Sequence, residues 1–277
     1  MATNVTTRLL CLDIDGTLLT TGNRFDREAH SAIGYAAARG FLVTYITGRG
    51  LPRLRSALAA SEIRVPDSTL VGVEHGARII EVGGRSQPSI DPLDPTTCQS
   101  LFESLLEEEL EFLAFHPEDD PVNSLVWAPD PEVRASLELR FSNASYITGR
   151  KEQVLGLTLA RRPAMITVRL RRDAAALPAS ATTWRSGNLT LVRDTETKGR
   201  ALVQLMHRAG AGPASTLVVG DAGADASMLR LVPPRNRILV GPELIGTEVD
   251  EPDVLTAPGP SGVGRVVRNA VDQQIGS

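Results

Sequence analysis

The chain of 277 residues has few aromatic side chains, only two cysteines and no long uncharged apolar run. Phe, Trp and Tyr make up 4% of the sequence, so aliphatic packing must dominate the core. With only Cys11 and Cys98, no disulfide framework is expected, and a reducing compartment fits. No stretch approaches a membrane span, and residues 1–8 lack the apolar segment of a signal peptide. We therefore expect a cytoplasmic protein without a membrane partner.

An excess of one charge is missing as well. The chain carries 29 Lys and Arg against 33 Asp and Glu, which gives a formal net charge of −4. A nucleic-acid-binding domain usually shows a basic stripe, so we expect no nucleic-acid partner. The basic clusters at 161–162 and 169–172 are interpreted as solvated faces. With 42% hydrophobic and 22% charged residues, the composition is that of a soluble globular protein, and it leaves the oligomeric state open.

Short apolar runs alternate with helical patterns over both ends of the chain. Runs of four to six apolar residues are typical of strands that are buried on both faces of a parallel sheet. They lie at 9–12, 41–46, 70–73, 216–219 and 237–240. Helical patterns lie at 27–39, 51–60, 198–209 and 225–231. This alternation predicts an α/β fold with a Rossmann-like, doubly wound parallel sheet.

The middle of the chain follows a looser pattern. It contains an acidic helical segment at 101–113, strand patterns at 124–127 and 165–170, and a hairpin pattern at 182–192 around Gly187-Asn188. Strands with period two suggest an antiparallel sheet with one covered face. We therefore predict an inserted α+β domain at 83–191, which divides a core into residues 1–82 and 192–277.

The sharpest motif is Asp13-Ile14-Asp15-Gly16-Thr17, directly after the first apolar run. In an extended chain residues i and i+2 point to the same side, so both carboxylates reach one site at the strand's carboxyl end. We expect Asp13 to ligate a cation and attack phosphorus, and Asp15 to act as acid and base. Gly16 allows a sharp turn that exposes backbone N–H groups to an anion.

Two more positions suit phosphate binding. Thr47 follows the run 41–46, and its hydroxyl is expected to bind a phosphoryl oxygen while Gly48 lets a backbone N–H approach. A plain Thr-Gly turn is the alternative. Lys198 lies at a helix start, where the dipole disfavours a lysine. That local cost suggests that Lys198 neutralises a phosphate or orients Asp13.

A second pair of carboxylates follows the run 216–219. Asp221 offers the hard oxygen ligand that magnesium prefers. Asp225, four residues later, is expected to hold a metal-bound water or Lys198. The alternative for Asp225 is a simple N-cap of the helix that follows.

These elements, in this order, resemble the four motifs of the haloacid dehalogenase superfamily of aspartyl-phosphate enzymes. The first motif is matched by 13–17, the second by Thr47, the third by Lys198 and the fourth by 220–225. The insertion looks like the type IIB cap of that superfamily. The turn at 47–49 looks like the Cof-like sugar phosphatases, and the segment 257–262 looks like the mannosyl-3-phosphoglycerate and sucrose-phosphate phosphatases.

The resemblance implies a magnesium-dependent phosphatase that acts on a small phosphorylated metabolite, a sugar phosphate, through a phospho-aspartate. It implies catalytic roles for Asp13 as nucleophile, Asp15 as acid and base, and Thr47 and Lys198 as phosphate stabilisers. The phosphate contacts it implies include Gly16, Gly48 and Arg49. The Mg²⁺ site it implies consists of Asp13, the backbone carbonyl of Asp15, Asp221 and a supporting Asp225.

Two positions depart from the family pattern. Ala224 stands where relatives usually have asparagine, and Glu74-His75-Gly76 replaces an asparagine-glycine turn. His75 is either a substrate contact or an incidental turn residue. In the insertion, the candidate substrate contacts are Arg150, Lys151, Arg162 and Arg185.

Two other functions stay open at this point. A phosphotransferase, such as a phosphomannomutase, would pass the phosphoryl group from the aspartate to a sugar. A non-catalytic sugar-phosphate binding protein would keep the fold without turnover, and Ala224 is the feature that favours it most.

Overall fold

The computed structural model divides the chain into two compact units. The core unit comprises Met1–Arg49, Leu54–Gln87 and Glu196–Ser277, and the second unit comprises Gly50–Arg53 and Pro88–Thr195. The domain limits predicted from the sequence stay a prediction. The residues that the structure describes are 7–20, 24–61, 65–83, 89–90, 93–107, 109–117, 120, 123–138, 144–163, 165–170, 183–186, 189–192 and 197–276.

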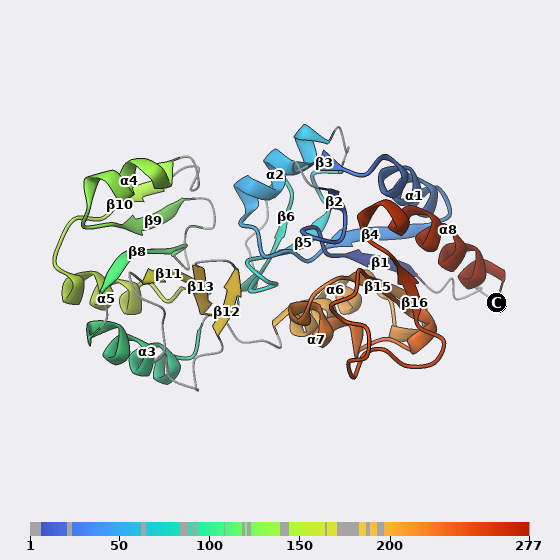
Figure 1. Ribbon diagram of the computed structural model, residues 1–277. Helices are drawn as coiled ribbons and strands as arrows, with labels where there is room; N and C mark the ends of the chain where they lie inside the picture. The colour runs from blue at the N-terminus through green and yellow to red at the C-terminus, as the bar shows by residue number, and fades with distance from the viewer. Residues whose placement is uncertain are drawn as a thin grey trace. The chain divides into compact units, whose positions relative to one another are not determined.

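A five-stranded parallel sheet forms the centre of the core unit (Figure 1). The strands, in spatial order, are β16 (Leu255–Ala257), β15 (Arg237–Val240), β14 (Thr216–Gly220), β1 (Arg8–Leu12) and β4 (Phe41–Tyr45). Every residue of β14 and β15 is buried, as expected for strands covered on both faces. The predicted α/β fold with a parallel sheet is confirmed.

The direction of winding changes between β1 and β14. From β1 the chain moves to β4 on one side, whereas β14, β15 and β16 follow on the other side. The register pairs Leu12 with Val219, and the Asp13 backbone N–H donates to the Val219 carbonyl at 3.0 Å. The carboxyl ends of these two strands therefore lie level at a topological switch point, where ligands bind in open α/β sheets.

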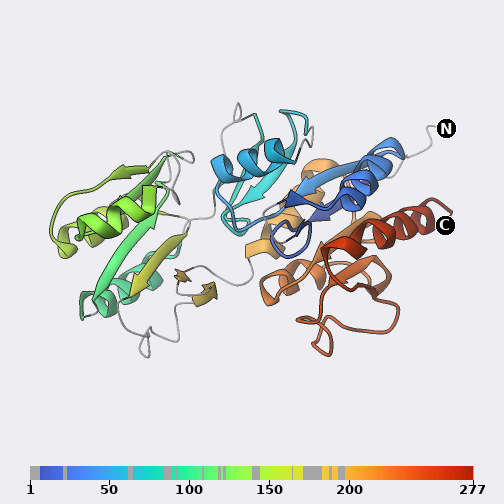
Figure 2. The same cartoon turned by 45° about the horizontal axis from the view of Figure 1, so that its top comes forward.

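Helices cover both faces of this sheet (Figure 1). On one face lie α1 (Arg27–Ala38) and α8 (Pro260–Gly276), and on the other lie α6 (Thr197–Ala209) and α7 (Ala226–Leu229). Figure 2 shows α1 and α8 side by side. Their approach needs a glycine, because a Cβ at Gly264 would lie 2.4 Å from the Glu28 carbonyl.

The helix ends follow from capping residues. The Asp26 carboxylate accepts hydrogen bonds from the backbone N–H groups of Glu28 and Ala29, which starts α1. The helix stops before Gly40, whose φ of +84° suits glycine. The bounds of α2 (Leu51–Ala60) are those of the helix predicted at 51–60. The predicted helix at 225–231 is shorter, because a 3₁₀ turn at Gly223–Asp225 precedes α7.

One predicted parallel strand belongs elsewhere. β5 (Leu70–Val73) pairs antiparallel with β6 (Arg78–Glu81), so the prediction that 70–73 is a strand of the parallel sheet was wrong. The reason is the tight turn that follows, which returns the chain along β5. A single parallel bridge between Ile46 and Gly72 joins β5 to the end of β4. The remaining elements of this unit are β2 (Leu19–Thr20), β3 (Arg24–Phe25) and the 3₁₀ turns Pro213–Ser215 and Pro234–Asn236.

The second unit contains a six-stranded sheet with the spatial order β10, β9, β8, β11, β13, β12. All pairs are antiparallel except β10 with β9. These strands are β8 (Leu110–Phe115), β9 (Ser124–Trp127), β10 (Ala144–Tyr146), β11 (Ile166–Leu170), β12 (Thr183–Ser186) and β13 (Leu189–Val192). The predicted hairpin of β12 and β13 is confirmed, and its turn at 187–188 lies outside the described residues. The other elements of the unit are β7 (Ser89–Ile90), α3 (Pro95–Glu107), α4 (Pro131–Glu138) and α5 (Lys151–Ala160).

Two predictions for the second unit were wrong. The helix predicted at 101–113 ends at Glu107, because residues from Leu110 onward pair with β9 and β11. One covered face was predicted for the sheet, but apolar clusters lie on both of its faces. Leu113 packs with residues of α3 and α5, whereas the next residue back, Phe112, packs with Leu137 of α4.

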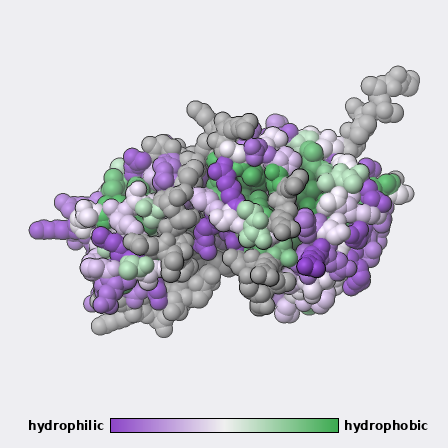
Figure 3. All heavy atoms as spheres, turned by 90° about the horizontal axis from the view of Figure 1, so that it is seen from above, coloured by the Kyte–Doolittle hydropathy of each residue, from purple (hydrophilic) through white to green (hydrophobic). Residues whose placement is uncertain are grey.

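The coloured surface in Figure 3 is mostly hydrophilic or neutral, with apolar residues in smaller groups. Among the described residues, no helix combines the length and apolar character that crossing a membrane requires.

Candidate active site

Asp13 lies at the end of β1 with its side chain almost fully buried. Ile14, between the two aspartates of the motif, is completely buried, while the Asp15 side chain is 54% exposed. Asp13 and Asp15 therefore differ sharply in environment although they are only two residues apart. Their positions at the carboxyl end of β1 agree with the geometry expected of the motif.

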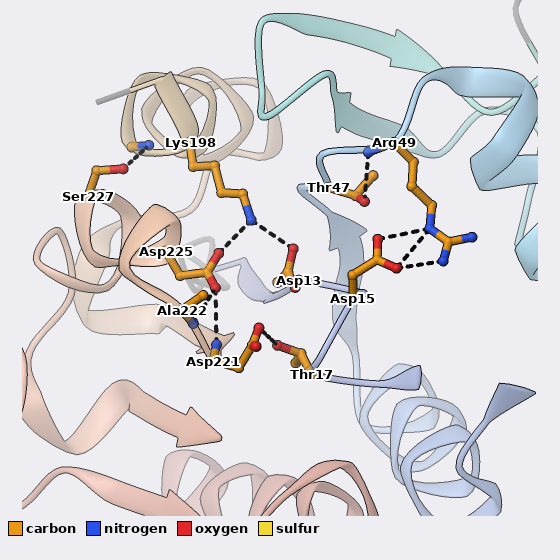
Figure 4. Close-up of polar contacts among 11 residues, drawn as sticks. Asp13, Asp15, Thr17, Thr47, Arg49, Lys198, Asp221, Ala222, Asp225 and Ser227 are labelled. Atoms are coloured by element: carbon orange, nitrogen blue, oxygen red, sulfur yellow. Dashed lines mark hydrogen bonds and ion pairs between the residues drawn. The ribbon is translucent and has the colours of Figure 1, made fainter. Parts of the chain in front are cut away.

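Lys198, the second residue of α6, joins two buried carboxylates (Figure 4). Its ammonium group donates to Asp13 Oδ1 at 2.7 Å and to Asp225 Oδ1 at 2.6 Å. The three side chains are each at most 5% exposed. The structure thus brings together three residues that lie far apart in the sequence. Lys198 bonds one carboxylate in the segment after β1 and a second one in the segment after β14.

Burial and neighbouring charges shift the ionisation of these groups. Burial raises the pKa of Asp13 to about 8; the nearby Lys198 works against this shift, and Asp225 adds to it. Burial alone would lower the pKa of Lys198, but its two carboxylate partners raise it above the ordinary value. Burial also raises the pKa of the Cys11 thiol, which excludes Cys11 as a thiolate nucleophile.

Asp221 follows β14 and faces the loop after β1. Thr17 Oγ1 donates to Asp221 Oδ1 at 2.9 Å, and a Cβ at Gly16 would lie only 2.1 Å from Asp221 Oδ2. Gly16 also has a φ of +84°, which disfavours side chains. Burial and the charge of Asp225 raise the pKa of Asp221 to about 6, while the Thr17 hydrogen bond lowers it.

Three carboxylates of this cluster suit a divalent cation. Asp13, Asp221 and Asp225 each offer an oxygen within 4.8 Å of the others. Lys198 and the backbone N–H groups of Asp221 and Ala222 contact both oxygens of Asp225, at 2.6 to 3.1 Å. Among the described residues, Asp13 and Asp221 are bonded through Oδ1 only, which leaves their Oδ2 atoms for a cation. A hard cation such as Mg²⁺ needs few protein carboxylates. Its charge would offset the repulsion between these carboxylates, which adds to burial in raising the pKa values of Asp13 and Asp221.

Asp225 organises the loop between β14 and α7. Besides its bonds to two backbone N–H groups, its side chain fills the space that a Cβ at Gly220 would need, at 2.5 Å. Ser227 Oγ accepts from the Gly199 N–H at 3.0 Å and so ties the starts of α6 and α7 together. These contacts hold the loop after β14 around Asp225 and against the start of α6, and the supporting role of Asp225 in a metal site stays a prediction. The sequence alone did not indicate Ser227.

Thr47 and Arg49 lie in the loop after β4. The Thr47 N–H donates to the Gly72 carbonyl at 2.9 Å, and the Thr47 hydroxyl accepts from the Arg49 N–H at 3.2 Å. The Arg49 guanidinium forms a two-point ion pair with Asp15, with Nε at 2.9 Å from Oδ2 and Nη2 at 2.5 Å from Oδ1 (Figure 4). Arg49, predicted as a phosphate contact, thus holds the expected acid/base residue in this structure.

The turn between β5 and β6 supports that loop. The N–H of Glu74 donates to the Arg49 carbonyl at 2.9 Å, and the N–H of His75 donates to the Thr47 carbonyl at 2.8 Å. Glu74 and His75 have positive φ values of 53° and 57°, which non-glycine residues rarely adopt. Glu74 also forms a fully buried ion pair with Arg78 at 3.0 Å. The sequence did not reveal this pair, because its four-residue spacing also suits an exposed helical pair.

His75 also lies against the loop after β4. Its Nε2 would be 2.6 Å from a Cβ at Gly48, so the imidazole occupies the space that a side chain at position 48 would need. The glycine therefore allows this ring to pack on the loop.

The predicted substrate contacts of the second unit have local partners. The Arg150 N–H donates to Gln153 Oε1 at 3.0 Å at the start of α5, and Lys151 Nζ donates to the Leu106 carbonyl. Arg162 has a φ of 44° after α5, and Arg185 lies in β12. Their substrate contacts stay predictions.

Comparison with known proteins now adds to the geometry. The model of a family described as haloacid dehalogenase-like hydrolase matches residues 10–233, which span most of the chain and all four motifs. The chain belongs to the haloacid dehalogenase-like hydrolases. It is therefore an enzyme of a hydrolase family whose structural neighbours include phosphatases.

Solved structures agree on the fold. The sugar phosphatase BT4131, described as a subclass IIB member of the haloacid dehalogenase superfamily, superposes with a TM-score of 0.71 at 17% identity. That match covers 95% of this chain and 98% of BT4131. The phosphatase BT1666 from Bacteroides thetaiotaomicron gives a TM-score of 0.69 at 16% identity, covering 96% and 95% of the two chains. At these identities the likeness concerns the fold, and it extends over both units of the haloacid dehalogenase-like chain.

One curated relative is much longer than this chain. The chloroplastic endoribonuclease YBEY of Arabidopsis thaliana is 22% identical over 233 residues, which are 79% of this chain but 39% of the relative. The chain thus spans about two fifths of that protein's length. The nuclease activity in the relative's name belongs to that longer protein.

Proposed function

We propose that this haloacid dehalogenase-like hydrolase is a magnesium-dependent phosphomonoesterase that acts through a phospho-aspartate on Asp13. The substrate class we propose is a small phosphorylated metabolite, a sugar phosphate. The observation that carries the proposal is the buried Asp13 carboxylate, which Lys198 holds by Oδ1 and which has an oxygen within 4.8 Å of one from Asp221. A buried nucleophile beside a fixed ammonium group is suited to attack a phosphate dianion, whose charge would otherwise repel it.

The first step forms a bond between an Asp13 carboxylate oxygen and phosphorus while the bond from phosphorus to the leaving oxygen breaks. Asp15 in its protonated form donates a proton to that oxygen, so the leaving group departs as an alcohol. Thr47, in the loop after β4, and Lys198, in the first turn of α6, would hold the phosphoryl oxygens. A bound Mg²⁺, held by Asp13 and Asp221, would neutralise charge on the transferred group.

The second step releases phosphate. Asp15, now a carboxylate, takes a proton from a water molecule whose oxygen attacks phosphorus, and the bond to Asp13 breaks. Arg49 holds both oxygens of Asp15 in this structure, so Asp15 must leave the guanidinium before it can reach the leaving oxygen. Its 54% exposure leaves the room for that movement.

We also propose that residues 83–191 form an inserted cap domain that selects the leaving group. A covering domain would exclude water during the first step and supply contacts to the sugar. Arg150, Lys151, Arg162 and Arg185 are the candidates for these contacts.

The test compares Asp13→Asn with Asp15→Asn on two substrates with different leaving groups. Phosphate release is measured with an aryl phosphate and with a panel of sugar phosphates, each with and without Mg²⁺. Asp13→Asn should abolish turnover of both, because the amide cannot attack phosphorus. Asp15→Asn should lose far more activity on sugar phosphates than on the aryl phosphate, whose leaving group needs little help from an acid.

Two results would contradict the proposal. Wild-type rates in Asp13→Asn would rule out the covalent mechanism. Cleavage of the aryl phosphate that occurs only when a sugar acceptor is present, with a sugar phosphate and no free phosphate as product, would identify a phosphotransferase. Circular dichroism of each variant checks that the fold is intact.

A further inference from the structure

The loop that carries Asp221 is held by carboxylates from two directions. Asp225 Oδ2 accepts from the N–H groups of Asp221 and Ala222, and the next N–H along the chain, that of Gly223, donates to Glu243 Oε1 at 3.2 Å. Three consecutive backbone amides therefore end on side-chain carboxylates. The sequence motifs did not indicate Glu243, which lies 20 residues after the last of these amides.

Glu243 reaches this loop because of the sheet order. It follows β15, which is the direct neighbour of β14, and both strands point the same way. The loops at their carboxyl ends therefore leave the same edge of the sheet, where the cation site lies. Glu243 is exposed, so its contact with Gly223 closes the solvent side of the loop.

The charge of Glu243 adds to a site that is already anionic. Asp13, Asp221 and Asp225 lie together around one buried ammonium group, that of Lys198. The Glu243 carboxylate contacts the loop at Gly223, only two residues after Asp221. Ala224, inside the same loop, presents only a methyl group to its surroundings.

We propose that Glu243 is a positioning residue of the divalent-cation site, which fixes Gly223 and Asp221 and attracts the cation by its charge. This inference rests on the cation site of the proposed function. It separates into two parts that mutagenesis can distinguish: a hydrogen bond to the loop, and a negative charge near Asp221. Glu243→Gln keeps an acceptor and removes the charge, whereas Glu243→Ala removes both.

The experiment measures Mn²⁺ binding to the full chain by electron paramagnetic resonance, with Mg²⁺ as competitor and no substrate. We expect Glu243→Gln to raise the Kd for Mn²⁺ about 3- to 10-fold at low ionic strength. Carboxylates outside the ligand shell affect metal affinity by orienting the ligands, and the screening of an exposed charge by solvent limits the size of this effect. The loss should shrink in high salt. Glu243→Ala should weaken binding further.

Asp250→Asn is the matched control. Asp250 is also exposed, and it accepts a glycine N–H, that of Gly246, at 2.8 Å. Its substitution should leave the Kd unchanged. A wild-type Kd in Glu243→Gln at low salt, while the wild type binds Mn²⁺, would overturn this inference alone. Absence of binding by the wild type would overturn both this inference and the proposed magnesium site.

Discussion

Replacing Lys198 by methionine tests the central electrostatic feature of the site. The ammonium group lies 2.7 Å from Asp13 Oδ1 and 2.6 Å from Asp225 Oδ1, and all three side chains are buried. Methionine keeps an unbranched apolar side chain of similar length but provides no charge and no donor. The substitution therefore leaves two buried carboxylates without their shared cation, while the stem of the side chain still fills its space.

The cost follows from the price of an unpaired buried charge. Removing one partner of a buried ion pair typically destabilises a protein by about 3–5 kcal/mol. Loss of that size lowers Tm by about 6–20 °C in a unit of this size. The pH determines how much of this destabilisation is observed. Lys198 lowers the pKa of Asp13, so in the variant without Lys198 that pKa rises above about 8. Asp13 then takes up a proton, so the destabilisation is small in acid and grows as the pH rises.

Chemical denaturation of wild type and Lys198→Met at about pH 5 and about pH 9, without divalent cations, measures this difference. Lys198→Met/Asp13→Asn is the decisive control, because it removes one of the two stranded charges. We expect the double variant to be more stable than Lys198→Met at the higher pH. If Lys198→Met matched the wild type at about pH 9 to within about 1 kcal/mol, the reasoning would be refuted.

Three further predictions concern the cation and Asp15. Gly16→Ala should weaken Mn²⁺ binding at least tenfold, on the order of the loss seen when a metal ligand is displaced. The reason is that the alanine Cβ would collide with Asp221 Oδ2, and calorimetric titration measures the change in affinity. Arg49→Lys should lower kcat more than it raises KM on sugar phosphates, because a lysine cannot hold Asp15 at two points; steady-state kinetics separate the two constants, and a purely KM effect would indicate a phosphate contact. The rise in Tm caused by Mg²⁺ should grow from about pH 5 to about pH 8. The raised pKa values of Asp13 and Asp221 mean that the cation-free folded state loses stability as the pH rises through about 6 and about 8. Differential scanning fluorimetry measures this rise, and an equal rise at both pH values would contradict the prediction.

The sequence predicted the residues that gather at the switch point. Each of these side chains follows a buried strand or starts a helix, and parallel strands bring their carboxyl ends to one edge. Asp13, Lys198, Asp221 and Asp225 are accordingly within hydrogen-bond or ligand distance of one another in the structure. Local pattern was sufficient here because the fold places consecutive strand ends side by side.

Local pattern was not sufficient where a side chain had several possible partners. Arg49 lies directly after a phosphate-binding turn, so the sequence suggested a phosphate contact, yet its guanidinium meets Asp15. The buried pair of Glu74 and Arg78 depends on a turn with three left-handed residues in succession. Neither contact follows from spacing, because the first joins loops that follow two different strands and the second depends on the conformation of the β5–β6 turn.

The glycines around the site are explained by the space that the residues of the site need. Gly16 has a positive φ, but it also leaves the space that the Asp221 carboxylate occupies. Gly220 has no such φ, and a Cβ there would meet Asp225 at 2.5 Å. A Cβ at Gly76 would meet the Lys198 Cα at 3.2 Å. In each case the side chain or helix that needs the room belongs to the catalytic cluster. Close approach of these segments is thus what brings three carboxylates and one ammonium group into a space that also has to admit a cation and a phosphate.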